Sequence, residues 1–90
     1  MNIDSPSQAQ LDSLLKHYQT GDYGEAEKIA IFLTKQFPKH QFSWKVLGAL
    51  LKQTGRISEA FPPMKKASQL MPQDAEAHSN LGVTFKELGK

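Results

Sequence analysis

Identical residues recur along the sequence with one fixed period. Gly21, Gly55 and Gly89 lie 34 positions apart. Other identical residues keep the same spacing: Ala26 and Ala60, Pro38 and Pro72, Leu47 and Leu81, Gly48 and Gly82, and Lys52 and Lys86. A fixed period of this length is the signature of proteins that stack one supersecondary unit repeatedly. We therefore expect a solenoid in which each unit packs against its neighbours.

Polar caps and prolines predict the ends of the helices in the first unit. Ser5 can cap a helix that has Pro6 at its first position and Gln8 at its third, which forms a capping box. Asp22 can cap the next helix. Pro38 should terminate that helix, because the residue before a proline is pushed out of the α region.

The second unit contains an unusual pair of prolines. Pro62 and Pro63 would lie inside a helix that began near Ser58, where a missing backbone hydrogen bond costs about 3 kcal/mol or more. A helix that begins at Phe61 or Pro62 avoids this cost, because both prolines then lie in its first turn. We therefore expect residues 57–61 to form an irregular or 3₁₀-like turn.

The complete chain should be all-α, with five helices in antiparallel pairs. One helix is expected over about residues 41–53, and Asp74 can cap a fifth helix that ends at Gly89. The connections between the helices are short, so neighbouring helices should run antiparallel.

The second unit resembles the tetratricopeptide repeat (TPR) family, whose repeats place large and small residues at fixed positions of two helices. The matching residues are Trp44-x2-Leu47-Gly48-x2-Leu51, Gly55, Ala60-x3-Met64, Ala67 and Pro72. The resemblance implies one domain with a tail at residues 1–4, repeats at 5–38 and 39–72, and the first helix of a third repeat at 73–90. It also implies that Gly48 and Ala60 let two helices approach closely, while Trp44 and Leu51 fill the wider spaces around them.

The helix expected over residues 41–53 carries two apolar stripes. Trp44, Leu47 and Leu51 define its core side, whereas Phe42 and Val46 lie on the opposite side, where an ordinary amphipathic helix is polar. We expect the second stripe to line a concave groove that binds a partner, although contacts between successive helices could instead consume it. The complete predicted groove comprises Leu11, Leu15, Tyr18, Phe42, Lys45, Val46, Ala49, Lys52, Asn80, Val83 and Lys86.

The resemblance separates two kinds of TPR ligand. In TPR domains that clamp the C-terminal carboxylate of chaperones, lysine, asparagine and arginine occupy the places held here by Leu11, Leu15, Val46, Glu76 and Asn80, so the clamp is absent. Residues 75–89 look instead like the superhelical TPR arrays of glycosyltransferases of the O-GlcNAc transferase type. That likeness implies that Asn80 grips the backbone of a peptide, although Asp12 and Val46 depart from the asparagine pattern.

Composition argues against catalysis. Ninety residues with 39% hydrophobic side chains fit one small domain, which rarely encloses a deep pocket. The chain has no cysteine, its three histidines are far apart, and neither a nucleophile elbow nor a phosphate-binding loop is present. We therefore expect no enzyme activity, no metal and no cofactor.

Charge and hydropathy bear on partners and location. Eleven Lys and Arg against nine Asp and Glu are scattered along the chain, which does not indicate binding to nucleic acid. The sequence has neither a secretory signal nor a long apolar run, so we expect no membrane association and a cytoplasmic protein.

Two functions remain after these exclusions. The first is an interaction module that binds a peptide or helix of a partner protein in the concave groove. The alternative is the N-terminal recruiting segment of a larger glycosyltransferase-like enzyme, with the present chain a truncated part of it. In either case Leu81, Phe85 and Leu88 form an apolar stripe on the last helix, which predicts a homodimer through that helix.

Overall fold

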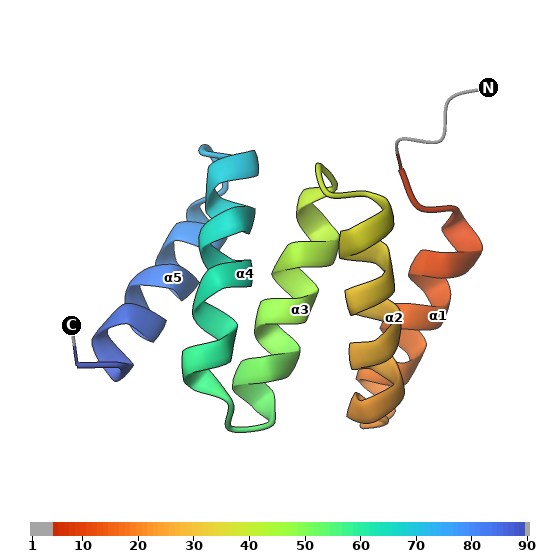
Figure 1. The fold of residues 1–90 in the computed structure, drawn as a ribbon, viewed down its shortest axis with the longest axis horizontal. Coiled ribbons are helices and arrows are strands. Elements are labelled where there is room, and N and C mark those ends of the chain that lie inside the picture. Colours follow the sequence, from red (N-terminus) through yellow and green to blue (C-terminus); the bar gives the residue numbers. More distant parts are fainter. Residues whose placement is uncertain (1–4, 90) are drawn as a thin grey trace.

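The structure is a computed structural model that describes residues 5–89, so the expected tail at residues 1–4 lies outside the described residues. Five α-helices follow one another along the chain (Figure 1). They are α1 (Gln8–Gln19), α2 (Tyr23–Gln36), α3 (Gln41–Gln53), α4 (Ile57–Leu70) and α5 (Ala75–Glu87). Between Ser5 and Gly89 there is no strand, which confirms the all-α prediction.

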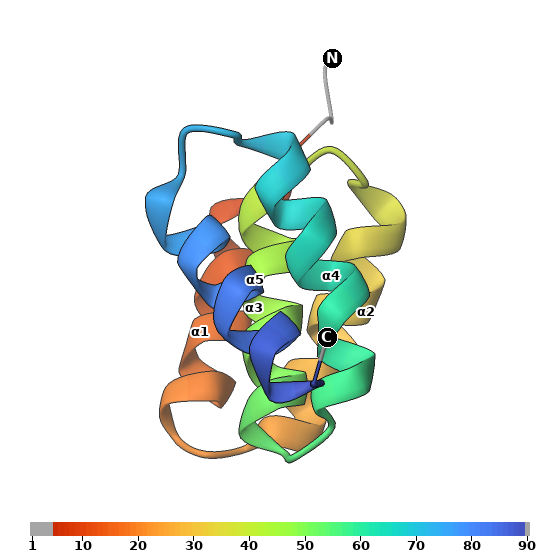
Figure 2. The same ribbon diagram turned by 90° about the vertical axis from the view of Figure 1, so that its left-hand side faces the viewer.

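The helices form an elongated array of two layers. Helices α1, α3 and α5 lie on one side and α2 and α4 on the other (Figure 2). Each helix packs chiefly against its neighbours along the chain, and the molecule measures 43 × 28 × 19 Å. None of the helices described combines the length and the apolar character that are needed to cross a bilayer.

The turns repeat the same geometry with the period of the sequence. Gly21, Gly55 and Gly89 have φ values of 81°, 80° and 76°, a left-handed conformation that glycine adopts without steric cost. The amides that follow the first two glycines both bond back to a carbonyl of the preceding helix at 2.8 Å, Asp22 to His17 and Arg56 to Leu51. These glycines therefore end the odd-numbered helices in the same way, as the sequence predicted for Gly89.

The connections after α2 and α4 are also equivalent. The indole nitrogen of Trp44 donates to the carbonyl of Pro38 at 2.8 Å, and the ring nitrogen Nε2 of His78 lies 2.6 Å from the carbonyl of Pro72. The two ring residues are one period apart, and so are the two prolines. His78 therefore makes the hydrogen bond of the tryptophan that it replaces.

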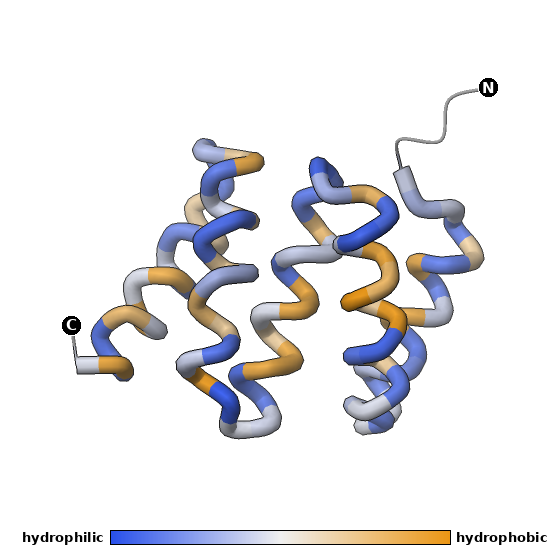
Figure 3. The backbone as a smooth tube through the Cα atoms, viewed as in Figure 1, coloured by the Kyte–Doolittle hydropathy of each residue, from blue (hydrophilic) through white to orange (hydrophobic). Residues whose placement is uncertain are grey.

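At one pair of equivalent core positions, the large and the small side chain lie on opposite helices in the two units. Gly48 lies so close to α4 that an added Cβ would be 2.7 Å from Cγ of Met64 and 3.6 Å from the carbonyl oxygen of Ala60, which confirms the predicted close approach. One period earlier the large residue is Leu14 and the small one is Ala30, and both are completely buried. The two units therefore fill equivalent volumes from opposite helices. Hydrophobic segments recur along every helix to build this core (Figure 3).

Two expectations about the core of α3 were inaccurate. Leu51 is 5% exposed as predicted, but Trp44 is only half-buried. Leu50, which the helical stripe did not include, is completely buried. The reason is that α3 packs against both α2 and α4, so its buried arc is wider than a single stripe.

The cap of α1 lies two residues later than predicted. Ser7, not Ser5, accepts a hydrogen bond from the amide of Gln10 at 3.1 Å, and the Gln10 side chain accepts from the Ser7 amide at 2.8 Å. The same capping-box spacing occurs here, and Pro6 is buried before the helix begins. Asp22 does stand at the N-cap of α2, but its carboxylate makes no cap hydrogen bond and contacts His17 instead.

The predicted late start of α4 is wrong. The helix begins at Ile57, and Pro62 and Pro63 lie inside it. The amides of Glu59 and Ala60 both donate to the carbonyl of the cap residue Arg56, at 3.1 and 3.0 Å. Two observations explain why the helix persists: Pro63 is buried in the array, and the carbonyls deprived of a partner belong to exposed residues, where water can bond to them.

Candidate binding surface

An open hollow of about 360 Å³ lies on the layer of odd-numbered helices. It is lined by Tyr18 of α1, Ala49, Lys52 and Gln53 of α3, Met64 of α4 and Asn80 of α5. Three successive helices of that layer thus contribute to one depression. Its lining combines apolar side chains with amide, phenol and ammonium groups.

Asn80 also borders a narrow gap between α3 and α5. The gap has a volume of about 10 Å³ and is lined by Lys45, Met64, Ala67, Ala77 and Asn80. A volume of this size has no room for a ligand group larger than water. Asn80, which is half-buried, is therefore accessible to a group larger than water only from the larger hollow.

Lys45 joins α3 to the start of α5. Its ammonium Nζ lies 3.0 Å from Oδ2 of Asp74 and also contacts the carboxylate of Glu76. The hydrogen bond to Glu76, together with that to Asp74, raises the pKa of Lys45 above its ordinary value. The same contact with Lys45, and the amide of Ala77, lower the pKa of Asp74. Lys45 is therefore a structural cross-link as well as a border of the surface.

Asp74 is the centre of this cross-link. Its Oδ1 accepts a hydrogen bond from the amide of Ala77 at 3.2 Å, as predicted for a helix cap, and its Oδ2 accepts one from Nε2 of Gln41 at 2.9 Å. A second link between α3 and α5 joins Lys52 to Glu87 at 3.0 Å. Both lysines of α3 that were predicted to border the groove are thus paired with carboxylates of α5 or of its cap.

The structure gathers part of the predicted groove. Tyr18, Ala49, Lys52 and Asn80 line one hollow, and Lys45 lies in the adjoining gap. Val46 is 5% exposed and belongs to the core, as the alternative interpretation of the stripe allowed. The other predicted residues stand outside the hollow: Leu11 and Leu15 are half-buried, whereas Phe42, Val83 and Lys86 are exposed.

Two residues that were not predicted for the groove, Gln53 and Met64, also line the hollow. Gln53 follows Ala49 by four residues, so the helical spacing that selected Ala49 could also have selected it. Met64 was assigned to the close approach with Gly48. It is only 5% exposed yet lines both depressions, since it lies beneath the junction of α3 and α5.

The apolar stripe of α5 is partly covered. Phe85 is 44% exposed, although its ring packs on that of Phe61 with a centroid separation of 5.6 Å. Leu81 and Leu88 are half-buried. An added Cβ at Gly82 would meet nothing within 4 Å, in contrast to Gly48. This face of α5 is therefore open where the equivalent face of α3 is covered by α4.

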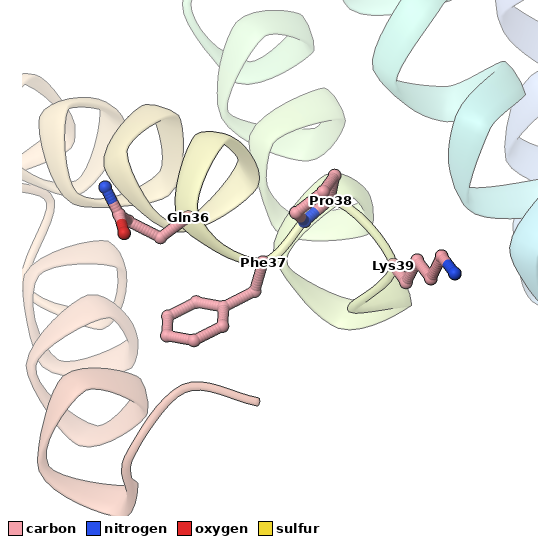
Figure 4. A pocket seen from close by; sticks show the side chains of 4 residues that line it. All are labelled: Gln36, Phe37, Pro38 and Lys39. Atoms are coloured by element: carbon pink, nitrogen blue, oxygen red, sulfur yellow. The ribbon is translucent and has the colours of Figure 1, made fainter. Parts of the chain in front are cut away.

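A third depression offers no convergent chemistry. It has a volume of about 280 Å³ at the connection between α2 and α3, and the side chains of Phe37 and Lys39 on its border point in opposite directions (Figure 4). Within residues 5–89, no three His, Asp or Glu side chains gather to hold a metal ion.

Part of the chain is similar to a known glycosyltransferase. The chain is 32% identical over 75 residues to the UDP-N-acetylglucosamine--peptide N-acetylglucosaminyltransferase of Caenorhabditis elegans. The matched region covers 83% of this chain but only 6% of that enzyme. No protein-family model matches the chain. The similarity agrees with the likeness of residues 75–89 to arrays of the O-GlcNAc transferase type.

Proposed function

We propose that this chain is a TPR-type interaction module that binds an extended peptide of a partner protein. The period of the sequence, the repeated turn geometry and the similarity to the Caenorhabditis elegans transferase support assignment to this class. The observation that carries the proposal is the hollow shared by α1, α3 and α5, which joins Tyr18, Ala49, Lys52 and Asn80.

The hollow suits a peptide bound by burial and by backbone hydrogen bonds. The amides of Gln53 and Asn80 can each donate to and accept from a peptide group, whereas Ala49 and Met64 provide an apolar floor. The ammonium of Lys52 is shared with Glu87, so a charged ligand would have to compete with that ion pair. The surface therefore favours recognition of a peptide backbone over recognition of a terminal carboxylate.

Selection from a random-peptide library tests this function. Selected peptides are expected to bind at least about tenfold more weakly to Asn80→Ala and to Ala49→Arg, a change of about 1.4 kcal/mol or more. Ser79→Ala is the matched control, because Ser79 is exposed next to Asn80 and does not line the hollow. Peptides that bind all these folded variants equally would place recognition elsewhere and contradict the proposal.

The similarity supports a second candidate function, a recruiting segment of a larger glycosyltransferase-like enzyme. In that case the present chain delivers a substrate protein, and catalysis belongs to residues beyond Lys90. The sequence of the parent gene tests this directly. Further units of the same period followed by a glycosyltransferase domain would support it, and a stop codon after Lys90 would exclude it.

A further inference from the structure

An apolar hollow of about 320 Å³ lies between α1 and α2. Its lining consists of Gln10 and Ser13 of α1 and Lys28, Ile29, Phe32 and Leu33 of α2. None of these residues lines the hollow on the layer of odd-numbered helices. It is thus separate from the surface proposed above to bind a peptide.

The second unit shows which side chains fit this place. Gln10 and Ser13 stand one period before Trp44 and Leu47. In α3 an indole and a leucine side chain therefore occupy the positions at which α1 carries a shorter amide and a hydroxymethyl group. The hollow in the first unit therefore lies beside the positions that carry these two larger side chains in the second.

The wall contributed by α2 is apolar and accessible. Leu33 is completely buried and Ile29 packs against the core, so core contacts hold the floor of the hollow in place. Phe32 lines the hollow and is 51% exposed. Removal of such a surface from water is favourable, so the apolar wall and the exposed ring of Phe32 together favour contact with an apolar group.

Lys28 lines the hollow, and a second lysine lies on the same side of α2. Lys28 and Lys35 lie four residues before and three residues after Phe32, hence on the same side of α2. The Lys28 ammonium is 3.3 Å from the Glu25 carboxylate, but its side chain remains 76% exposed. Lys35 is exposed as well. One carboxylate against two ammonium groups leaves this border net positive, which complements an acidic segment.

We propose that this hollow is a second docking site, which takes one aromatic side chain of the size of tryptophan from an acidic segment of a partner protein. The aromatic ring would occupy the place that Trp44 holds in the second unit. Carboxylates beside it would lie near Lys28 and Lys35. A protein bound here and a peptide bound on the odd-numbered helices could be held at the same time.

A blocked tripeptide with tryptophan between two glutamates is the probe that tests the site. In ¹⁵N NMR titrations of the complete chain, saturable shifts are expected for Ser13, Ile29 and Phe32, with none at Asn80. The same peptide with alanine in place of tryptophan should cause no saturable shift. A peptide with two lysines in place of the glutamates should bind more weakly, and this difference should shrink as salt is added.

Variants at one position make the test specific. Ser13→Leu adds the side chain found at the equivalent position of α3, so it should reduce the affinity for the probe at least about tenfold. Ser13→Ala leaves the hollow empty and should bind like the wild-type chain. Phe32→Ala, at a half-exposed position, should also weaken binding while the chain stays folded. Equal binding by Ser13→Leu and Ser13→Ala, or shifts that centre on Asn80, would overturn the proposal.

Discussion

At the scale of single residues, the contact between Gly48 and Met64 determines how closely α3 and α4 approach. Gly48→Leu should lower the free energy of unfolding by about 1 to 3 kcal/mol, because an overpacked core forces helices apart. Adding Met64→Ala should restore part of the loss, since leucine and alanine already occupy the equivalent positions 14 and 30. Urea unfolding of the two single variants and the double variant measures this coupling.

Gly82 provides the control for that experiment. An added Cβ at Gly82 meets no atom within 4 Å. Gly82→Ala should therefore stabilise the chain by up to about 1 kcal/mol through its higher helix propensity. If Gly48→Leu proved as harmless as Gly82→Ala, the close approach of α3 and α4 would not exist in solution.

His40 makes stability depend on pH. His40 is the N-cap residue of α3. Its Nδ1 lies 2.8 Å from the hydroxyl of Ser43 and 3.4 Å from the Ser43 amide, so the neutral ring can accept the cap hydrogen bond. Burial lowers the pKa of His40 below its ordinary value of 6.5. The unfolded chain therefore binds a proton at a higher pH than the folded chain does.

Neutral His40 should make its full contribution to the free energy of unfolding above about pH 6.5. This contribution should fall as the pH decreases from there towards the pKa of His40 in the folded chain. His40→Asn keeps a side-chain acceptor at the N-cap but cannot titrate. The difference in unfolding free energy between the wild-type chain and this variant should change between about pH 7 and pH 5, as measured by urea unfolding. A difference that is constant over this range would exclude a role for His40 protonation.

At the scale of helices, substitutions of the two prolines of α4 can distinguish the cost of a missing backbone hydrogen bond from the gain of apolar packing. Pro62 is exposed and Pro63 is buried, yet each removes one hydrogen bond from the helix interior. Pro62→Ala should stabilise the chain by about 1 to 3 kcal/mol, whereas Pro63→Ala should gain less because it loses apolar contacts. Circular dichroism and urea unfolding measure both effects. Destabilisation by Pro62→Ala would favour a helix that begins only at Phe61 or Pro62.

The helices also show what could be predicted from sequence and what could not. The bounds of α3 were predicted correctly, because apolar spacing and flanking polar residues agree there. The start of α4 was not, since a rule about proline cost cannot include the burial that Pro63 gains. The burial of Val46 and Leu50 depends on the helices that pack against α3. The pairing of Lys45 with Asp74 and Glu76 depends on α5 and its cap, so neither feature follows from the spacing within α3 alone.

At the scale of the whole molecule, the open face of α5 should cause self-association of the chain. Phe85 is 44% exposed, Leu81 and Leu88 are half-buried, and Gly82 leaves room for a close neighbour. We expect a homodimer in which α5 of one copy covers α5 or α4 of another. Sedimentation equilibrium over a wide concentration range should show a dimer for the wild-type chain and a monomer for Phe85→Glu.

Two results would contradict this dimer. One is a wild-type chain that stays monomeric at the highest concentration. The other is a dimer that Phe85→Glu leaves unchanged. Lys86→Glu is the matched control, because it alters the charge of a neighbouring exposed residue of α5 while keeping Phe85.

Because each helix packs chiefly against the next one along the chain, tension applied to the two ends would load one interface at a time. The outer helices should then detach and rebind reversibly at forces lower than the force that separates α3 from α4. Optical tweezers should record a staircase of small, reversible extensions. A single abrupt rupture would show that the five helices resist force as one block.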